Sequence, residues 1–582
     1  MTARSQRRAR SGGPADAGRA RTGGSRPEGR VGRRPRFDGV ALALYQGLFA
    51  ACAEEMGVTL MRTAHSPNIK ERLDHSCAVF DRLGRLVAQA AHIPVHLGSL
   101  PRAVEAARAL APFAPGDTVV LNDPFAGGTH LPDVTLVSPV FLGRAGPPVF
   151  FVASRAHHAD VGGGAPGSMP LAREVYEEGL RLPPVFLARR GRIERDVLTL
   201  LLANVRTPEE RRADLLAQLG AQATGASRLA AIARASGREE LVAAAGALME
   251  HADRCVRAAL RGLPRGAFRF EDSLDDDGLG HGPVRIRVRL EIGPDSLRAD
   301  FTGSSPQVPG PVNTVEPVTR AAAAYALRCV LGGDFPVNDG AFRRLRVVAP
   351  AGSVVNALPP AAVAAGNVET SQRIVDVVLG ALARALPGRI PAASSGTMNN
   401  LLIGGLDPRT SRAFAYYETL AGGHGAGPGW DGASALQAHM TNTRNTPIES
   451  LEHAYPLRVR VTRIRRGSGG GGRYRGGQGI VREIELLAPS RVTVMSERRK
   501  TRPYGLRGGA PGAAGVNLVQ RRPGGPFERM PGKFSVDLRS GAAIRVASPG
   551  GGGFGPARPR VPRRRGRMQP RSPRTRGGAR PA

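Results

Sequence analysis

The most informative parts of the sequence are two short stretches, NDPFAGGTHLPD at residues 122–133 and RAHHAD at residues 155–160. Together they hold three histidines and three aspartates: His130, His157, His158, Asp123, Asp133 and Asp160. Imidazole nitrogens and carboxylate oxygens suit a divalent ion such as Zn, Mn or Fe. Apolar runs at 118–122, 134–141 and 149–154 predict strands. We therefore expect the metal candidates at strand ends and in loops, where a rigid scaffold usually carries chemistry.

The pair His130-x-x-Asp133 is weak evidence for a metal site by itself, although Pro132 fixes the backbone between the two side chains. The second histidine stretch, one predicted strand later, strengthens it. The alternative is that one of the paired histidines only packs or hydrogen-bonds a carboxylate. Because neighbouring residues of a strand point to opposite faces, at most one of His157 and His158 should ligate. The other would be an outer hydrogen-bond partner or a proton shuttle.

Asp74, in the charged segment KERLDHS (70–76), could add a carboxylate, but such a loop is more often only solvated. Glycines at 127–128 and 162–164 flank the two histidine stretches and permit close backbone approach to a ligand. Neither cluster matches a Walker A or dinucleotide motif. The sequence therefore predicts no nucleotide site on this chain, and any ATP would be held by a partner.

The formal net charge of +34 is concentrated at the two ends of the chain. Residues 1–36 carry 11 Arg against two acids, and residues 557–582 carry ten Arg and no acid. Only three of the 82 basic residues are Lys, which GC-rich coding explains more simply than selection for phosphate contacts. No recognition motif accompanies the charge, so we expect no specific nucleic-acid partner. Both tails are predicted to be disordered.

Several other classes are also disfavoured by the sequence. It contains no apolar run of about 18 residues and no apolar signal-peptide core, so we expect neither a membrane span nor secretion. The four cysteines are widely spaced and form no CxxC motif. Reduced thiols and a cytoplasmic location are therefore expected.

Hydrophobic periodicity predicts an α+β fold of several domains. Helices are predicted at 38–63, 99–111, 208–262, 318–332 and 367–386. A hairpin is predicted at 77–87, and the alternation in VRIRVRL (284–290) predicts a strand with one solvated face. Without a regular βαβ repeat, the pattern favours mixed sheets with helices over a doubly wound sheet.

Five regions are expected along the chain. They are a disordered Arg-rich tail (1–36), a metal-bearing α+β region (37–265), an α+β region with polar pocket loops (266–456), a β-rich region (457–556) and a second disordered tail (557–582).

Four segments farther along combine hydrogen-bonding side chains with glycine: NVETSQR (367–373), SGTMNN (395–400), YETLAGGHGA (417–426) and HMTNTRNTP (439–447). One explanation is a network that pins loops, and the other is a polar substrate pocket. For the pocket we single out four substrate-binding candidates, Asn367, Glu369, Asn399 and His424. No GxSxG elbow occurs, so a serine nucleophile is not indicated.

These motifs, together with NVRTPEERRADLLAQ (204–218), DFTGSSPQV (300–308) and SPGGGGFG (548–555), resemble the hydantoinase B family, in order from about residue 37 to 556. That family includes N-methylhydantoinase B, the C-terminal half of 5-oxoprolinase, and the equivalent subunits of acetone and acetophenone carboxylases and of caprolactamase. Only the two Arg-rich tails fall outside the resemblance.

The resemblance implies a two-component enzyme. A hydantoinase A-type subunit with an actin-like ATPase fold would phosphorylate the lactam or carbonyl oxygen, and the hydantoinase B-type subunit would hold a divalent metal whose activated water opens the ring. In carboxylating members an enol phosphate would meet CO2 instead. By the resemblance, the metal ligands correspond to His130, Asp133 and His157, with Asp74 as the remaining carboxylate. His158 and Asp160 become the candidates for hydrogen-bonding the metal ligands or for catalysis.

We therefore expect the metal-bearing subunit of an ATP-dependent hydrolase of small cyclic amides, working in a hetero-oligomer with an ATPase subunit. One alternative is the corresponding subunit of a ketone carboxylase. The other is a non-catalytic partner that only stabilises the ATPase subunit. Retention of His130, Asp133 and His157 argues against this last alternative.

Overall fold

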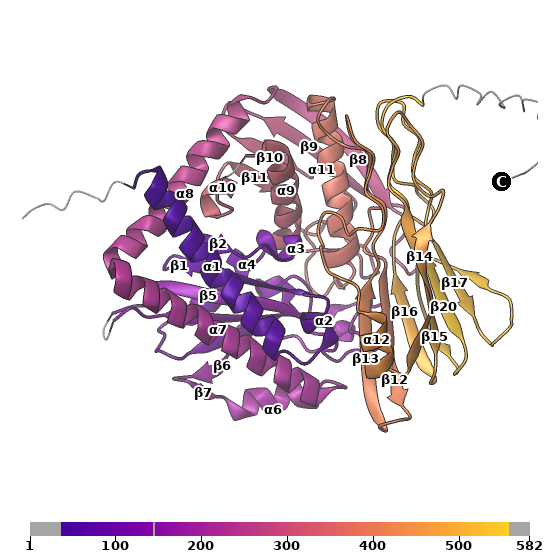
Figure 1. The fold of residues 1–582 in the computed structure, drawn as a ribbon, viewed down its shortest axis with the longest axis horizontal. Helices are drawn as coiled ribbons and strands as arrows, with labels where there is room; N and C mark the ends of the chain where they lie inside the picture. Colours follow the sequence, from indigo (N-terminus) through magenta and orange to yellow (C-terminus); the bar gives the residue numbers. More distant parts are fainter. Residues whose placement is uncertain (1–36, 144–145, 334, 558–582) are drawn as a thin grey trace, which may run out of the picture. The chain divides into compact units, whose positions relative to one another are not determined.

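The computed structural model describes residues 37–143, 146–333 and 335–557. The two predicted tails lie outside these ranges, except for Ala557. Helices and four sheets make up the described chain (Figure 1). The predicted α+β class with several mixed sheets is confirmed. Among the described residues, no helix is both long enough and apolar enough to cross a membrane.

The first sheet is antiparallel and has seven strands in the order β2-β1-β5-β4-β3-β6-β7. Its strands are β1 (His75–Asp81), β2 (Leu86–Gln89), β3 (Thr118–Leu121), β4 (Asp133–Val140), β5 (Phe150–His157), β6 (Val185–Arg189) and β7 (Arg192–Ile193). The central strands β1, β4 and β5 are buried along their whole length. The predicted hairpin and the predicted strands at 118–122, 134–141 and 149–154 are confirmed, and β5 continues three residues farther, to His157.

Helices cover both faces of this sheet. On one face lie α1 (Gly39–Thr63), α7 (Pro208–Ser236) and α8 (Arg238–Arg261), which pack on one another and on β1, β2, β4 and β5. On the other face lies α4 (Leu100–Arg108), preceded by the short α3 (Pro94–Leu97). The predicted helix at 38–63 is confirmed. The predicted single helical stretch at 208–262 is two helices, because Gly237 adopts a φ of 91° that ends α7.

The second sheet has the order β11-β10-β9-β8. Its strands are β8 (Gly266–Leu274), β9 (Val284–Ile292), β10 (Leu297–Asp300) and β11 (Leu345–Val348). Buried and more exposed residues alternate along β9, as its sequence predicts. Helix α11 (Ser371–Ala385) packs on β8 and β9, and α9 (Glu316–Leu331) packs on α11. A single π-helical turn, η2 (Gly366–Thr370), leads into α11.

Short helices lie in the connections between these elements and before β14 of the C-terminal part. They are η1 (Pro124–Ala126), α2 (Pro67–Lys70), α5 (Val175–Glu178), α6 (Arg195–Ala203), α10 (Asp339–Phe342) and α12 (Ile448–Ala454).

Two further sheets form the C-terminal part and share one hydrophobic core. One has the order β13-β12-β16-β19, built from β12 (Asn400–Asp407), β13 (Arg412–Thr419), β16 (Ser490–Met495) and β19 (Lys533–Leu538). The other has the order β14-β15-β20-β17-β18, built from β14 (Leu457–Arg465), β15 (Gly479–Leu486), β17 (Val516–Gln520), β18 (Glu528–Met530) and β20 (Ala543–Ala547). The domain boundaries at 265 and 456 stay predictions, and one hydrophobic cluster runs from Ile93 to Met495 across both.

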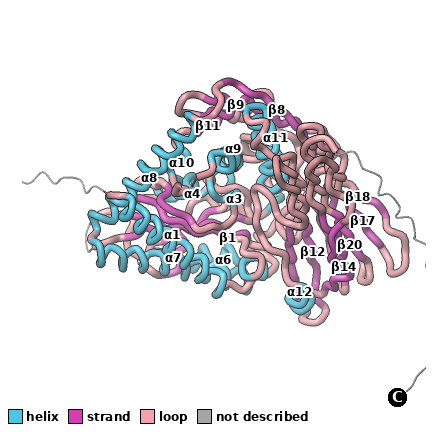
Figure 2. The backbone as a smooth tube through the Cα atoms, turned by 45° about the horizontal axis from the view of Figure 1, so that its top comes forward, coloured by secondary structure: helices cyan, strands magenta, loops and turns pink. Residues whose placement is uncertain are grey.

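Segments 422–427, 468–479, 503–513 and 548–555, which we name the glycine layer, pack backbone against backbone with little regular secondary structure. Figure 2 shows the loops beside the C-terminal strands. Gly470 N donates to Gly551 O at 2.8 Å, and Gly551 N donates to Gly477 O at 2.9 Å. A Cβ at Gly551 would lie 1.9 Å from the carbonyl oxygen of His424. Glycine is therefore required there by close backbone approach.

We expect Gly551→Ala to lower the free energy of unfolding by about 2 kcal/mol or more, because two backbone segments must separate to admit the methyl group. Gly471→Ala is the matched control, since a Cβ at Gly471 meets nothing within 4 Å. Thermal and chemical denaturation of the two variants measure the difference. Equal stabilities would show that the layer is not tightly packed.

Candidate metal centre

Three of the predicted ligands converge. Within the described residues, one donor atom each from His130, Asp133 and His157 lies within 4.8 Å of the other two. Asp133 is the first residue of β4 and stands opposite His157, the last residue of β5. Asp133 Oδ1 is 3.1 Å from His130 Nε2 and 3.4 Å from His157 Nδ1. All three side chains are buried. The antiparallel register of β4 and β5 therefore brings the two sequence motifs together.

The loop before β4 is built to present His130. Asp123 caps its first turn by accepting a hydrogen bond from the backbone N–H of Phe125 at 3.0 Å. Gly127 adopts a φ of 99°, which only glycine enters without strain. Thr129 Oγ1 donates to Asp133 Oδ2 at 2.6 Å. Asp123 therefore shapes the loop, and Asp133 enters the centre already oriented.

The orientation of His130 argues that a cation belongs beside it. Its Nδ1 lies 3.1 Å from the carbonyl oxygen of Ala364, which can only accept a hydrogen bond. Nδ1 therefore carries a hydrogen, and Nε2 is the ring nitrogen that faces the centre. Nε2 lies against Asp133 Oδ1 and has no hydrogen-bond partner among the described residues. At 3.1 Å this nitrogen and the carboxylate oxygen need a positive charge between them, which a proton or a bound metal cation supplies.

Protonation in the centre favours the same conclusion. Burial alone would raise the pKa of Asp133, but the imidazoles of His130 and His96 hold it well below the ordinary range. Burial lowers the pKa of His157 to about 3, so that ring is neutral at physiological pH. A carboxylate anion and neutral imidazoles are the forms that bind divalent metals. The buried N,N,O donor set fits such an ion.

His96 in α3 is a member of this centre that the sequence motifs did not identify. Its Nε2 lies 3.4 Å from Asp133 Oδ2, and its Nδ1 lies 2.8 Å from Ser76 Oγ. The rings of the buried His75 and the partly buried His92 stand nearby with centroids 4.8 Å apart. The available signal was the spacing HIPVH at 92–96, in which proline again fixes the backbone.

Asp74 lies beside the centre, and its carboxylate is not part of the three-residue group. Its carbonyl oxygen accepts a hydrogen bond from His157 N at 3.0 Å. Burial raises the pKa of the Asp74 carboxyl to about 7, against the lowering effect of Arg72. Its role as the fourth ligand stays a prediction.

The structure gives the two catalytic candidates other partners. His158 Nε2 lies 3.0 Å from Gln218 Oε1 of α7. Asp160 accepts hydrogen bonds from the backbone and the guanidinium of Arg206. Both side chains are buried. Their catalytic roles stay predictions, and these contacts anchor the segment after β5 against α7 and the loop before it.

Two of the predicted substrate-binding residues reach the centre from the π-helical turn η2. Asn367 Nδ2 donates to Asp133 Oδ2 at 3.2 Å, and Asn367 Oδ1 has no partner among the described residues. Glu369 Oε1 accepts from Asn400 Nδ2 at 2.8 Å, and Asn400 Oδ1 accepts from Tyr417 Oη at 2.9 Å. The Tyr417 ring stacks on His157 with centroids 4.5 Å apart. Single π-turns often mark functional sites.

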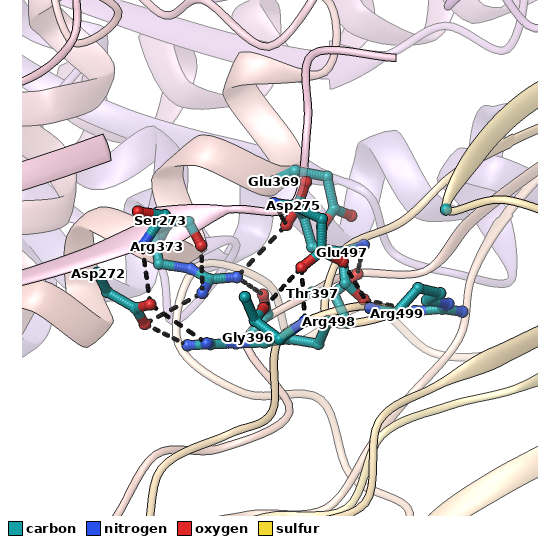
Figure 3. A network of polar contacts seen from close by, with 12 residues as sticks. Asp272, Ser273, Asp275, Glu369, Arg373, Gly396, Thr397, Glu497, Arg498 and Arg499 are labelled. Atoms are coloured by element: carbon teal, nitrogen blue, oxygen red, sulfur yellow. Dashed lines mark hydrogen bonds and ion pairs between the residues drawn. The ribbon is translucent and has the colours of Figure 1, made fainter. Parts of the chain in front are cut away.

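The other two substrate-binding candidates lie elsewhere. Asn399 Oδ1 accepts from Arg499 Nη1 at 2.7 Å and so belongs to a buried network of charged groups (Figure 3). In that network Arg373 and Arg498 bind Asp272, while Glu497 binds Lys533. Burial, and then the neighbouring Glu497, raise the pKa of Glu369 to about 7. His424 lines a separate cavity of about 260 Å³.

A family model described as Hydantoinase B/oxoprolinase matches residues 38–557. An uncharacterized protein of Methanocaldococcus jannaschii is 38% identical, over 89% of this chain and 91% of its own length. A 5-oxoprolinase of Arabidopsis thaliana is 39% identical, and this chain covers 42% of its length. A protein of a Pseudomonas strain, named as the putative B-type subunit of a D-/L-hydantoinase, is 31% identical over 90% of its length.

Two solved structures share the fold. The ATP-dependent caprolactamase from Pseudomonas jessenii has a TM-score of 0.84 and 30% identity, over 90% of this chain and 92% of that one. An acetone carboxylase structure has a TM-score of 0.83 and 19% identity, over 89% of this chain and 75% of that one. At that identity, the second likeness concerns the fold alone.

Glu178 holds the backbone that orients His130, and its titration can be measured. Its Oε1 accepts from the backbone N–H groups of Val363 and Ala364, each at 2.8 Å, and Ala364 in turn orients His130. Burial raises the pKa of Glu178 from 4.5 to about 8. The folded state therefore favours the protonated carboxyl, and its contribution to stability is lost as the pH rises through 8.

As the pH rises from the unfolded to the folded pKa of Glu178, we expect the free energy of unfolding of the wild type to fall relative to that of Glu178→Gln. The fall should be roughly 1.4 kcal/mol per pH unit. Gln retains an acceptor oxygen for both backbone groups and does not titrate. Chemical denaturation of both proteins at pH 5, 7 and 9 measures the difference. A difference that does not change with pH would show that Glu178 titrates normally.

Proposed function

The chain belongs to the hydantoinase B/oxoprolinase family, and on that premise we propose that it is the metal-bearing subunit of an ATP-dependent enzyme that hydrolyses small cyclic amides. The observation that carries the proposal is the buried group of His130, Asp133 and His157, in which an imidazole nitrogen and a carboxylate oxygen face each other at 3.1 Å. A structural subunit would have no use for such a costly arrangement of buried polar groups.

The chain's own residues would hold one divalent ion through His130, Asp133 and His157, with Asp74 as the fourth candidate. Such an ion, when bound, lowers the pKa of water toward neutrality and orients it toward an electrophile. The donor set is compatible with Zn, Mn or Fe. Asn367 Nδ2 holds Asp133 in place, and the amide oxygen of Asn367 has no partner among the described residues. Burial of all three ligands excludes bulk water from the reacting groups.

ATP is assigned to a partner chain. A cyclic amide resists hydrolysis because resonance protects its carbonyl, and O-phosphorylation would remove that protection. The sequence contains no Walker A or dinucleotide motif that would hold the nucleotide here. One relative is named as one subunit of a hydantoinase, which supports a hetero-oligomer with an ATPase subunit. The free cysteines suit a reducing, cytoplasmic location.

We prefer cyclic amides over ketones as substrates because the more similar proteins are named for cyclic amides. The 5-oxoprolinase, the hydantoinase subunit and the caprolactamase are each at least 30% identical to this chain. The acetone carboxylase, at 19% identity, supports only the fold.

We expect the purified chain to hold about one equivalent of a divalent metal, and His130→Ala or Asp133→Ala to reduce it to background, because each removes one of three donors. His65→Ala, at an exposed histidine, is the matched control and should retain the metal. Inductively coupled plasma mass spectrometry after dialysis measures the ratio. Full metal in both ligand variants would refute the site.

With its ATPase subunit, the chain should release ADP and open the ring of one or more of hydantoin, 5-oxoproline and caprolactam. Asp133→Ala should lower ring opening at least about 100-fold, because the activated water is lost. Product analysis by mass spectrometry with and without bicarbonate separates the two reactions. Bicarbonate-dependent turnover of a ketone would move the chain to the carboxylases.

A further inference from the structure

A second polar cavity lies apart from the metal centre. Its volume is about 260 Å³, and it lies between α9, the segment after α11, and the loops around residues 424–430 and 438–439. The lining residue His439 is 3.7 Å from Asp376 of α11. None of the residues that line the cavity belongs to the metal centre. The cavity is therefore a separate place on the molecule.

One part of the cavity wall is apolar and suits a small ring. It is formed by aliphatic side chains and two aromatic rings: Val330, Leu379, Ile390, Tyr325 and Trp430. The volume equals the space of roughly eight or nine water molecules at about 30 Å³ each. Pockets for drug-sized ligands are usually larger, at about 300–1,000 Å³. The cavity therefore suits a single ring of five to seven atoms.

The polar part of the wall complements an amide group. His424 Nε2 lies 2.7 Å from the carbonyl oxygen of Gln437, so this nitrogen carries a hydrogen, and in that tautomer Nδ1 is an acceptor. Ser394 Oγ accepts from the backbone of Gly425 at 3.3 Å, and its hydroxyl hydrogen can be donated to a ligand. A cyclic amide has one N–H and one carbonyl oxygen, which these two groups match.

The backbone is strained where His439 enters the cavity. His439 adopts a φ of 57°, in the left-handed region that costs a non-glycine residue energy. Its Nε2 and the facing Asp376 Oδ1 lack hydrogen-bond partners among the described residues, and Arg498 holds the other oxygen of Asp376 at 2.8 Å. A buried imidazole nitrogen without a hydrogen bond, on a residue of strained backbone conformation, requires an explanation, and a ligand in the cavity supplies one.

We propose that this cavity is a binding site for the ring of a small cyclic amide, distinct from the metal centre. The choice of ligand rests on the proposed function, while the cavity itself does not. Neutral lactams with a free N–H are the ligands it should prefer. The apolar wall holds the ring, and His424 and Ser394 bind the amide.

Two residues of the chain report on this cavity directly. Trp430 is the only tryptophan of the sequence, so tryptophan emission, excited selectively over the tyrosines, reports on the cavity. Cys329 lines the same cavity and is exposed, whereas Cys255 lies elsewhere and serves as the internal control for thiol alkylation. We would titrate the full chain, without ATP or partner, with 2-pyrrolidinone, caprolactam, 5-oxoproline and N-methyl-2-pyrrolidinone. Peptide mass spectrometry would measure alkylation of each cysteine by iodoacetamide.

We expect saturable fluorescence changes with lactams, and slower alkylation of Cys329 but not of Cys255. Ser394→Ala should weaken binding about fivefold or more, and so should N-methylation of the lactam, since each removes one hydrogen bond. His130→Ala should bind normally, which separates this site from the metal centre. Absence of saturable binding at millimolar lactam, or binding lost in His130→Ala and kept in Ser394→Ala, would overturn the proposal. Equal binding of the N-methylated ring would overturn the amide assignment.

Discussion

The buried carboxylate of Asp133 is the group on which the arrangement of the central part depends. An uncompensated charge at that depth costs several kcal/mol, so the fold must surround it with partners. Those partners come from four places: β4 with its preceding loop, β5, α3 and the π-turn η2. The register of β4 and β5 is fixed by the same requirement. A slip of one residue would exchange His157 for His158, whose side chain faces α7.

Support for the centre extends well beyond its immediate contacts. Glu178 fixes the backbone at Ala364, and Ala364 fixes the tautomer of His130. On the other side, Glu369 and Asn400 hold Tyr417 against His157. Glu369 in turn adjoins the charged network of Figure 3, which joins β8, α11 and the loop after β16. Ligand orientation is therefore set by residues distant in the sequence, as is usual for metal centres.

What could be predicted from the sequence was local. The strands beside NDPFAGGTHLPD and RAHHAD follow from β-branched and aromatic runs, and the helix at 38–63 follows from periodicity. The convergence of His130, Asp133 and His157 followed because β4 pairs with β5 and His130 lies in the loop directly before β4. His96 could not be found this way, since only tertiary packing brings α3 against β4. The break between α7 and α8 depends on the positive φ of Gly237. The glycine layer depends on contacts between segments far apart in the sequence, which no local pattern encodes.

Anomalous diffraction from crystals of the metal-loaded chain would show directly whether this group holds a divalent ion. We expect one peak at the metal's absorption edge, about 2.0–2.3 Å from a nitrogen of His130 and an oxygen of Asp133. A nitrogen of His157 should be among the ligands. A peak elsewhere on the chain, with His130 and Asp133 still in mutual contact, would contradict this expectation. So would the absence of any peak at saturating metal.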